Sequence, residues 1–341
     1  MSTKKFLISI LKWVIIVLPF VWIFTRIELG DLSETISDVA WWTIPVLIFS
    51  TLLAMFLQGF RWWVLLRGPL HDLGLGITLR YHYYGIFYSI VLPGSAAQDI
   101  VKAALISRKY DYSAVWGATW TFKLLGLLSL VIMSSYGLAT IDYSTYSSQH
   151  IPTHYVFIFM ILLLVLTVLS FSKRFTRPLR RVFSRFIPKR FLSVIENIRQ
   201  SVYQYKNMPL RLIISFALSF LTQAVLVFNF ALVIRGISGE FFLNEVFGFV
   251  PIIEILCMII PLTPNGTGIR ESLTAILFRY LGLSAEQLAV FVAVIGLVPV
   301  LLKLVGAAPF LIGHKKSDIP DTGQLKEKEN EWNEIHHKKD T

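Results

Sequence analysis

Seven charged residues fall within otherwise apolar stretches of the chain: Asp99, Lys102, Lys123, Glu254, Arg270, Glu271 and Lys303. A charge at the centre of a membrane helix costs roughly 2.5–3.5 kcal/mol on insertion scales, so ionisable residues at such positions are candidates for function. Four of the seven are cations and three are acids, and this surplus of positive charge suits a phosphate. Each residue taken singly fits a structural ion pair as well as a ligand contact. Asp99 and Lys102 in particular stand at the i,i+3 spacing of a helical pair.

Other kinds of chemistry find little support in the sequence. The single cysteine, Cys257, lies in an apolar run, which leaves neither a disulfide framework nor a thiolate metal cluster to consider. The chain contains no phosphate-binding P-loop motif that would indicate ATP-driven pumping. It also shows no pairing of a nucleophile with a base. We therefore expect no catalytic residue, no metal ion and no cofactor.

The composition indicates a membrane protein. The 341 residues are 55% hydrophobic and 16% charged, with a mean hydropathy of +0.64, and such a chain cannot cover a water-soluble surface with polar groups. A spanning helix needs about 20 mostly apolar residues. We find six such runs, near residues 7–26, 43–65, 113–140, 154–172, 211–234 and 285–313. The sequence thus predicts an all-α, polytopic fold.

The distribution of basic residues predicts the orientation. Lys and Arg collect in short cytoplasmic loops, and Lys4 and Lys5 precede the first run, whereas acids follow it. We interpret three further basic residues, Arg61, Arg67 and Arg80, as marking the cytoplasmic end of the second span. We expect a multi-pass protein of the cell membrane with both termini in the cytoplasm. The net charge of +11 then reflects these loops, and we expect no nucleic acid partner.

Two segments outside the spans have distinctive compositions. Residues 173–206 hold ten Lys and Arg and one acid, arranged as a basic amphipathic surface segment that could bind anionic lipid headgroups. The alternative is a cytoplasmic loop with no specific ligand. Residues 314–341 alternate charges with almost no apolar residue, which predicts a disordered tail after an integral membrane domain that covers residues 1–313.

Two apolar stretches are broken by turns that resemble each other. The first turn holds Pro93 and Gly94 and leads to a helix with Asp99 and Lys102; the second holds Pro264, Asn265, Gly266 and Gly268 and leads to a helix with Arg270 and Glu271. The offset of 171 residues between Pro93 and Pro264 also relates Ser113 to Ser284. We interpret this as an internal repeat of about residues 43–140 and 211–313.

Broken backbone at membrane depth is tolerated only where protein or a cavity covers it, so both stretches are candidate re-entrant helical hairpins. Three expected spans lie between them, which makes the hairpins enter from opposite faces as an inverted repeat. Binding sites commonly lie at such a repeat interface. The alternative is that the turns merely end short helices. The expected fold therefore has six spanning helices and two re-entrant hairpins, with both turns and the seven charges as candidate lipid-binding residues.

Three motifs carry a family resemblance. The Arg61-Trp62 pair with Leu65-Leu66, the turn 92–94 that leads to Asp99 and Lys102, and above all the turn 264–271 resemble the flippase-like family that includes the transmembrane region of lysylphosphatidylglycerol synthases. The chain departs from the family pattern in its Asn265, in Ala96-Ala97, in Lys123 where arginine is common, and in Lys303, which would replace an arginine expected near Val294.

The resemblance implies a protein that moves phospholipid or a polyprenyl-linked lipid between leaflets. Lysylphosphatidylglycerol synthases also carry a large soluble aminoacyl-transfer domain, whereas only 28 residues follow Gly313 here, so we do not expect that synthesis. Two alternatives stay open. One is an intramembrane lipid-modifying enzyme that uses Asp99 or Glu271 as acid or base. The other is a non-transporting partner of a lipid-synthesising enzyme.

Overall fold

The structure is a computed structural model, and it describes residues 39–141 and 201–308, apart from 91, 93, 95, 261, 262, 264 and 265, together with residues 158 and 161. Several expected features lie outside the described residues. These are the spans near 7–26 and 154–172 (apart from residues 158 and 161), the basic segment up to residue 200, the tail 314–341, and the turn residues Pro93, Pro264 and Asn265.

Four long helices form the frame of the described protein: α3 (Thr43–Leu66), α6 (Tyr112–Thr140), α10 (Pro209–Ser238) and α13 (Ala285–Leu302), which continues as the 3-10 helix η4 (Lys303–Ala307). All four are long and apolar enough to cross a membrane. The 24 residues of α3, for example, extend about 36 Å at the helical rise, against about 30 Å of hydrocarbon. The described residues contain no strand, so these four expected spans are confirmed as helices of an all-helical protein.

Side-chain caps fix where two of the long helices begin. The carboxylate of Asp111 accepts a hydrogen bond from the Ala114 amide at 2.6 Å at the start of α6. The hydroxyl of Ser284 accepts one from the Gln287 amide at 3.2 Å at the start of α13. Such caps satisfy backbone donors that have no partner inside the helix.

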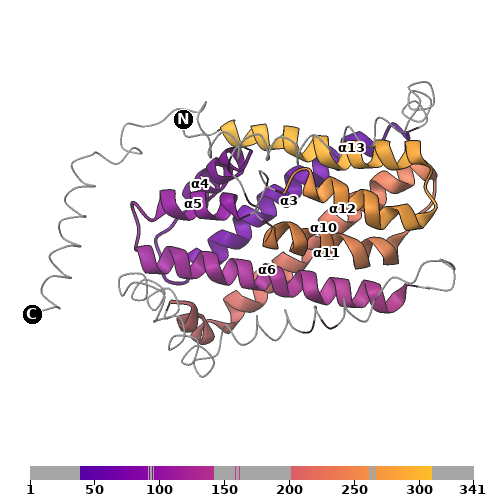
Figure 1. Ribbon diagram of the computed structural model, residues 1–341. Helices are drawn as coiled ribbons and strands as arrows, with labels where there is room; N and C mark the ends of the chain where they lie inside the picture. Colours follow the sequence, from indigo (N-terminus) through magenta and orange to yellow (C-terminus); the bar gives the residue numbers. More distant parts are fainter. Residues whose placement is uncertain are drawn as a thin grey trace, which may run out of the picture.

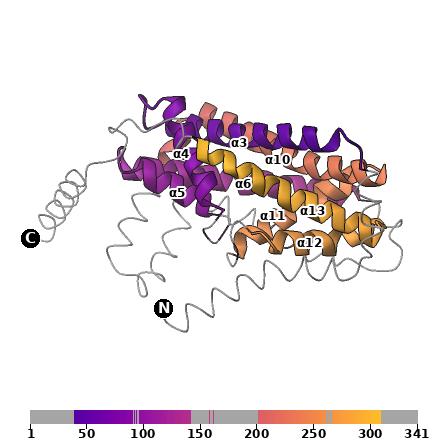
Figure 2. The same ribbon diagram turned by 90° about the horizontal axis from the view of Figure 1, so that it is seen from above.

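Two pairs of shorter helices complete the described fold. The first pair is α4 (Leu75–Tyr88) and α5 (Ala97–Ile106); the second is α11 (Leu243–Ile259) and α12 (Ile269–Phe278), followed by the 3-10 helix η3 (Arg279–Leu281). The ten residues of α5 reach only about 15 Å, half of a membrane core. Figures 1 and 2 show α4 and α5 beside one end of the long helices, and α11 and α12 beside the other end.

The tips of the two pairs meet in the middle of the molecule. The Gly94 amide, in the first turn, donates a hydrogen bond to the Thr263 carbonyl oxygen, in the second turn, at 2.9 Å. Gly94 and Gly268 have φ angles of 89° and 86°, which L side chains rarely adopt, and this explains glycine at both turns. The two glycine-containing turns therefore face each other.

The order of long and short helices in the first half of the described chain recurs in the second half. The set α3, α4, α5 and α6 corresponds to α10, α11, α12 and α13, and the offset of 171 residues carries Tyr88, the end of α4, onto Ile259, the end of α11. The start of α3 contacts the end of α10, because a Cβ on Gly236 would touch the Thr43 side chain. The corresponding first helices are therefore antiparallel, which is the geometry expected of an inverted repeat.

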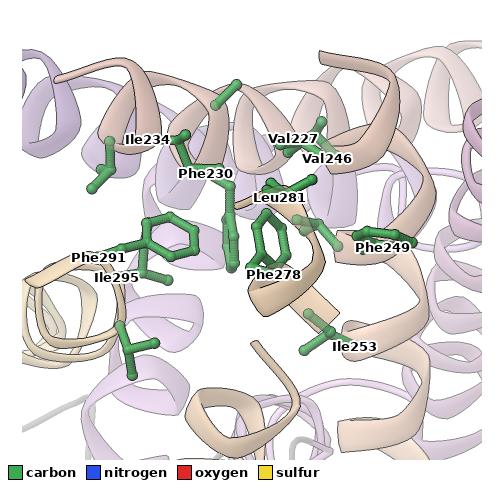
Figure 3. Close-up of a cluster of buried hydrophobic side chains, with 14 of the residues drawn as sticks. Val227, Phe230, Ile234, Val246, Phe249, Ile253, Phe278, Leu281, Phe291 and Ile295 are labelled. Atoms are coloured by element: carbon green, nitrogen blue, oxygen red, sulfur yellow. The ribbon is translucent and has the colours of Figure 1, made fainter. Parts of the chain in front are cut away.

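The described residues form two large apolar clusters. Phe230, Phe278 and Phe291, from α10, α12 and α13, face one another (Figure 3), with ring centroids 5.1–6.1 Å apart. In the second cluster, Trp62 packs with residues of α4, α5 and α6. Lipid tails are as apolar as these side chains, so close van der Waals packing rather than the hydrophobic effect holds such helices together.

The last residues of the basic segment 173–206 pack against this frame. Val202 and Tyr205 are buried, and the Tyr205 hydroxyl donates to the Leu65 carbonyl oxygen at 2.8 Å. Burial raises the pKa of the Tyr205 hydroxyl above its usual value. The described end of the segment is thus anchored to the end of α3 rather than lying free on a surface.

Candidate functional site

A cavity of about 260 Å³ lies between the two helix pairs and the long helices. Its walls come from α3, α4, α5, α6, α10, α11, α12, α13 and η4. Six charged residues line it: Arg61, Asp99, Lys123, Glu254, Arg270 and Lys303. Five of these were expected from the sequence as intramembrane charges, and the fold brings them from five different helical elements to one cavity.

Asp99 is the centre of the first charged group. Its carboxylate contacts the Lys102 ammonium at 2.6 Å, as an ion pair without hydrogen-bond geometry, and the Lys123 ammonium at 2.7 Å. Asp99 lies in the first turn of α5, where the helix dipole favours a negative charge. The pairing of Asp99 with Lys102 follows the i,i+3 spacing, whereas the contact with Lys123 links α5 to α6.

Lys102 and Lys123 differ in their access to the cavity. The Lys102 side chain is fully buried, and its ammonium lies 4.7 Å from the Trp62 ring and 4.0 Å from the Phe122 ring. The Lys123 side chain is 30% exposed and lines the cavity. Lys102 is therefore a buried structural cation behind the wall, while Lys123 presents its charge to the cavity.

Glu254 and Arg270 form the second charged group. Arg270 Nε donates to one carboxylate oxygen of Glu254 at 2.7 Å, and its Nη2 donates to the other at 3.1 Å. This two-point geometry is the strong form of an arginine–carboxylate pair. It joins α11 to α12 close to the turn between them.

Lys303 begins η4 at the end of α13 and is 8% exposed. Within the part of the chain that the structure describes, no carboxylate lies within ion-pair distance of its ammonium. It faces the same cavity as the other cations. Lys303 thus brings to the cavity an amino group that no described carboxylate contacts.

The sequence interpretation of Arg61 was wrong. Arg61 was placed with Arg67 and Arg80 at the cytoplasmic end of the second span, but it lies inside α3 and is 3% exposed. Its guanidinium donates to Ser219 Oγ at 2.5 Å and to the Phe122 carbonyl oxygen at 3.2 Å, and it lies 3.6 Å from the Phe122 ring centroid. The sequence did indicate that Arg61 lies inside the helix, because apolar residues 62–66 continue the span beyond it.

Glu271 has a role apart from the cavity. Its carboxylate accepts a hydrogen bond from the Gly268 amide at the start of α12, and the residue is 2% exposed. Glu271 also packs against Gly296, which lines the cavity from α13. The structure therefore shows Glu271 as a helix cap, with Gly266 and Gly268 shaping the turn before it.

The cavity has more positive than negative charge. Four cations and two carboxylates line it, and both carboxylates are already in ion pairs. Among the described residues, no group of three His, Cys, Asp or Glu side chains could hold a metal ion. The arrangement suits an anion such as a phosphate group.

Residues 9–306 match the family described as the lysylphosphatidylglycerol synthase TM region. The chain belongs to this family. The match spans all four long helices and both short pairs of this family member, and it confirms the resemblance seen in the turns. No curated protein and no solved structure matches the chain.

Membership of the lysylphosphatidylglycerol synthase TM family, together with the four apolar helices, makes the chain a membrane protein. The family is named for the membrane part of a lipid-synthesising enzyme, which is consistent with a role connected to membrane lipid.

Proposed function

We propose that the protein is a translocase that moves an anionic phospholipid or a polyprenyl-linked lipid between the leaflets of the cell membrane. The observation that carries the proposal is the cation-rich cavity at the meeting point of the two helix pairs. Charges are expensive at membrane depth, so a surplus of them around a cavity indicates an occupant of opposite charge.

The lipid phosphate is the natural occupant. The side chains of Lys123 and Lys303 line the cavity. Charge-assisted hydrogen bonds from an ammonium group to a phosphate are about twice as strong as hydrogen bonds between neutral groups. Drug-sized ligands use pockets of roughly 300–1,000 Å³, whereas this cavity has about 260 Å³. The cavity therefore suits a headgroup, while the acyl or prenyl chains stay in the bilayer.

The opposed helix pairs supply a route between leaflets. In the proposed topology α4 and α5 enter from the cytoplasmic face and α11 and α12 from the outer face, as re-entrant hairpins of an inverted repeat. The hydrogen bond between Gly94 and Thr263 lies where the two hairpins meet. Rocking of one repeat against the other would expose the headgroup site first to one face and then to the other, as in transporters built from inverted repeats.

The environment of the two acids favours translocation over lipid chemistry. Asp99 is held by two lysines and Glu271 by the backbone of its own helix. A general acid or base must reach the reacting proton, and these contacts occupy both carboxylates.

We also propose two kinds of partner. Anionic lipid headgroups would bind at residues 173–206, and a lipid-synthesising enzyme would supply the transported lipid.

Reconstitution tests the proposal. Purified protein is placed in vesicles with a fluorescent anionic phospholipid, and both leaflet exchange and chemical conversion of the lipid are measured. We expect exchange that depends on the protein, with the lipid recovered unchanged. Conversion of the lipid to a product would favour the enzyme, and the absence of both would favour the non-transporting partner.

A further inference from the structure

The polar side chains on the wall of the cavity formed by α3 and α10 are mainly uncharged, beside the single charge of Arg61. Two cross-helix contacts fix the register of these antiparallel helices. Arg61 donates to Ser219 at 2.5 Å, and about three turns away the Asn229 side chain accepts from Ser50 Oγ at 2.5 Å. Between these contacts, the same register places Gln58 on α3 at about the level of Gln223 on α10, and both line the cavity.

Both glutamines keep their hydrogen-bonding capacity. Neither amide has a hydrogen-bond partner among the described residues, and both side chains are half-buried. Asn229, by contrast, also donates to Thr51 Oγ1 at 3.3 Å, so its amide is used between the helices. A third glutamine, Gln98, faces the same cavity from α5. Unpaired amides are unfavourable at membrane depth, because a polar group without a partner loses its hydrogen bonds to water.

These amides suit hydroxyl groups better than amines. An amide both donates and accepts hydrogen bonds, as a hydroxyl does, whereas an ammonium only donates. An amine would also need a carboxylate, and the two that line the cavity, Asp99 and Glu254, already bind lysine and arginine. The surplus of cations would repel it further.

We propose that Gln58 and Gln223 form a subsite for headgroup hydroxyls, beside the cations that hold the phosphate. The preferred lipid is then a phosphodiester whose headgroup carries hydroxyl groups, as glycerol or a sugar does, rather than an amine. The inference rests on the proposed function, because it specifies the headgroup that the translocase selects.

Binding of three lipids by the purified full-length protein tests the subsite. The lipids are phosphatidylglycerol, phosphatidylethanol and phosphatidylethanolamine, and affinity is taken from the melting temperature in neutral detergent as each lipid is added. Phosphatidylethanol has the same charge as phosphatidylglycerol but no headgroup hydroxyl. We expect phosphatidylglycerol to bind about tenfold more tightly than phosphatidylethanol, which corresponds to the loss of about one hydrogen bond, and phosphatidylethanolamine to bind most weakly.

The variant Gln58→Met/Gln223→Met keeps similar side-chain volume and removes both amides. It should bind phosphatidylglycerol and phosphatidylethanol equally, while the control Gln204→Met, at an exposed position outside the cavity, keeps the tenfold preference. Equal binding of the two lipids by the wild-type protein would overturn the inference even if the double variant failed to fold. Because binding is measured without transport, a protein that prefers hydroxyl headgroups but exchanges no lipid would overturn the translocase and leave the subsite standing.

Discussion

Replacement of Asp99 by asparagine tests how the charged group at the first hairpin is held. The change keeps the shape of the side chain and removes its charge. Lys102, 2.6 Å from the carboxylate and with no exposed side-chain area, would then lose its negatively charged partner and keep only the neutral amide oxygen and the Trp62 and Phe122 rings. Lys123, whose side chain is 30% exposed, can still turn toward the cavity.

The size of the effect follows from this difference in burial. Loss of one partner of a buried ion pair costs about 3–5 kcal/mol, because it leaves an uncompensated buried charge. Asp99→Asn should therefore lower the free energy of unfolding by about that amount. Asp99→Asn/Lys102→Met removes the stranded charge as well and should recover most of the loss, since apolar replacements of buried ion pairs are often neutral. The coupling energy should be about 2–3 kcal/mol.

Unfolding in mixed micelles measures these free energies for the wild type, the two single variants and the double variant. The matched control is Lys123→Leu, which leaves Asp99 paired with Lys102 and should cost less than about 1 kcal/mol. Two results would refute the reasoning: a free energy of unfolding for Asp99→Asn within about 1 kcal/mol of the wild-type value, or a double variant as unstable as Asp99→Asn. Either result would mean that Asp99 does not stabilise the buried charge of Lys102.

Two further predictions concern the second hairpin and the topology. Glu271→Gln should lower stability by less than about 1 kcal/mol and leave lipid exchange and its pH dependence unchanged, because the amide oxygen can still accept from the helix start; loss of the pH dependence at a normal melting temperature would instead make Glu271 a coupling site. In a Cys257→Ala background, an impermeant thiol reagent should label Asp72→Cys from the cytoplasmic side and Glu240→Cys from the outside, since these exposed positions lie at the outer ends of the two hairpins. Labelling of both from one side would exclude the inverted arrangement.

Much of the helical frame could be predicted because hydropathy and length determine it directly. The span expected at 43–65 and the helix Thr43–Leu66 agree almost residue for residue. The matched turns were visible because proline and glycine break helices in a way that a sequence shows. The contact between Gly94 and Thr263 could not be predicted, since it depends on how two distant segments pack.

The site was predicted in part for a similar reason. Charged residues in apolar runs can be recognised from the sequence alone. Their partners on other helices, such as Asp99 for Lys123, can be identified only when the packing of the helices is known. Arg61 was missed because counting basic residues assigns any arginine near the end of a span to a loop. Gln58 and Gln223 gave no signal, because neutral amides are common on any polar surface and only their place in the cavity distinguishes them.

The rate of leaflet exchange by Lys123→Leu tests the central claim most directly. Lys123 presents its charge to the cavity and is not needed to neutralise Asp99, which keeps Lys102. Vesicles with equal amounts of folded wild type, Lys123→Leu and the control Arg108→Leu, at an exposed position outside the cavity, are compared for exchange of a fluorescent anionic phospholipid. We expect wild-type rates in the control and no exchange above empty vesicles in Lys123→Leu, because the cavity has lost a phosphate partner. Exchange by folded Lys123→Leu at the wild-type rate would contradict passage of the headgroup through this cavity.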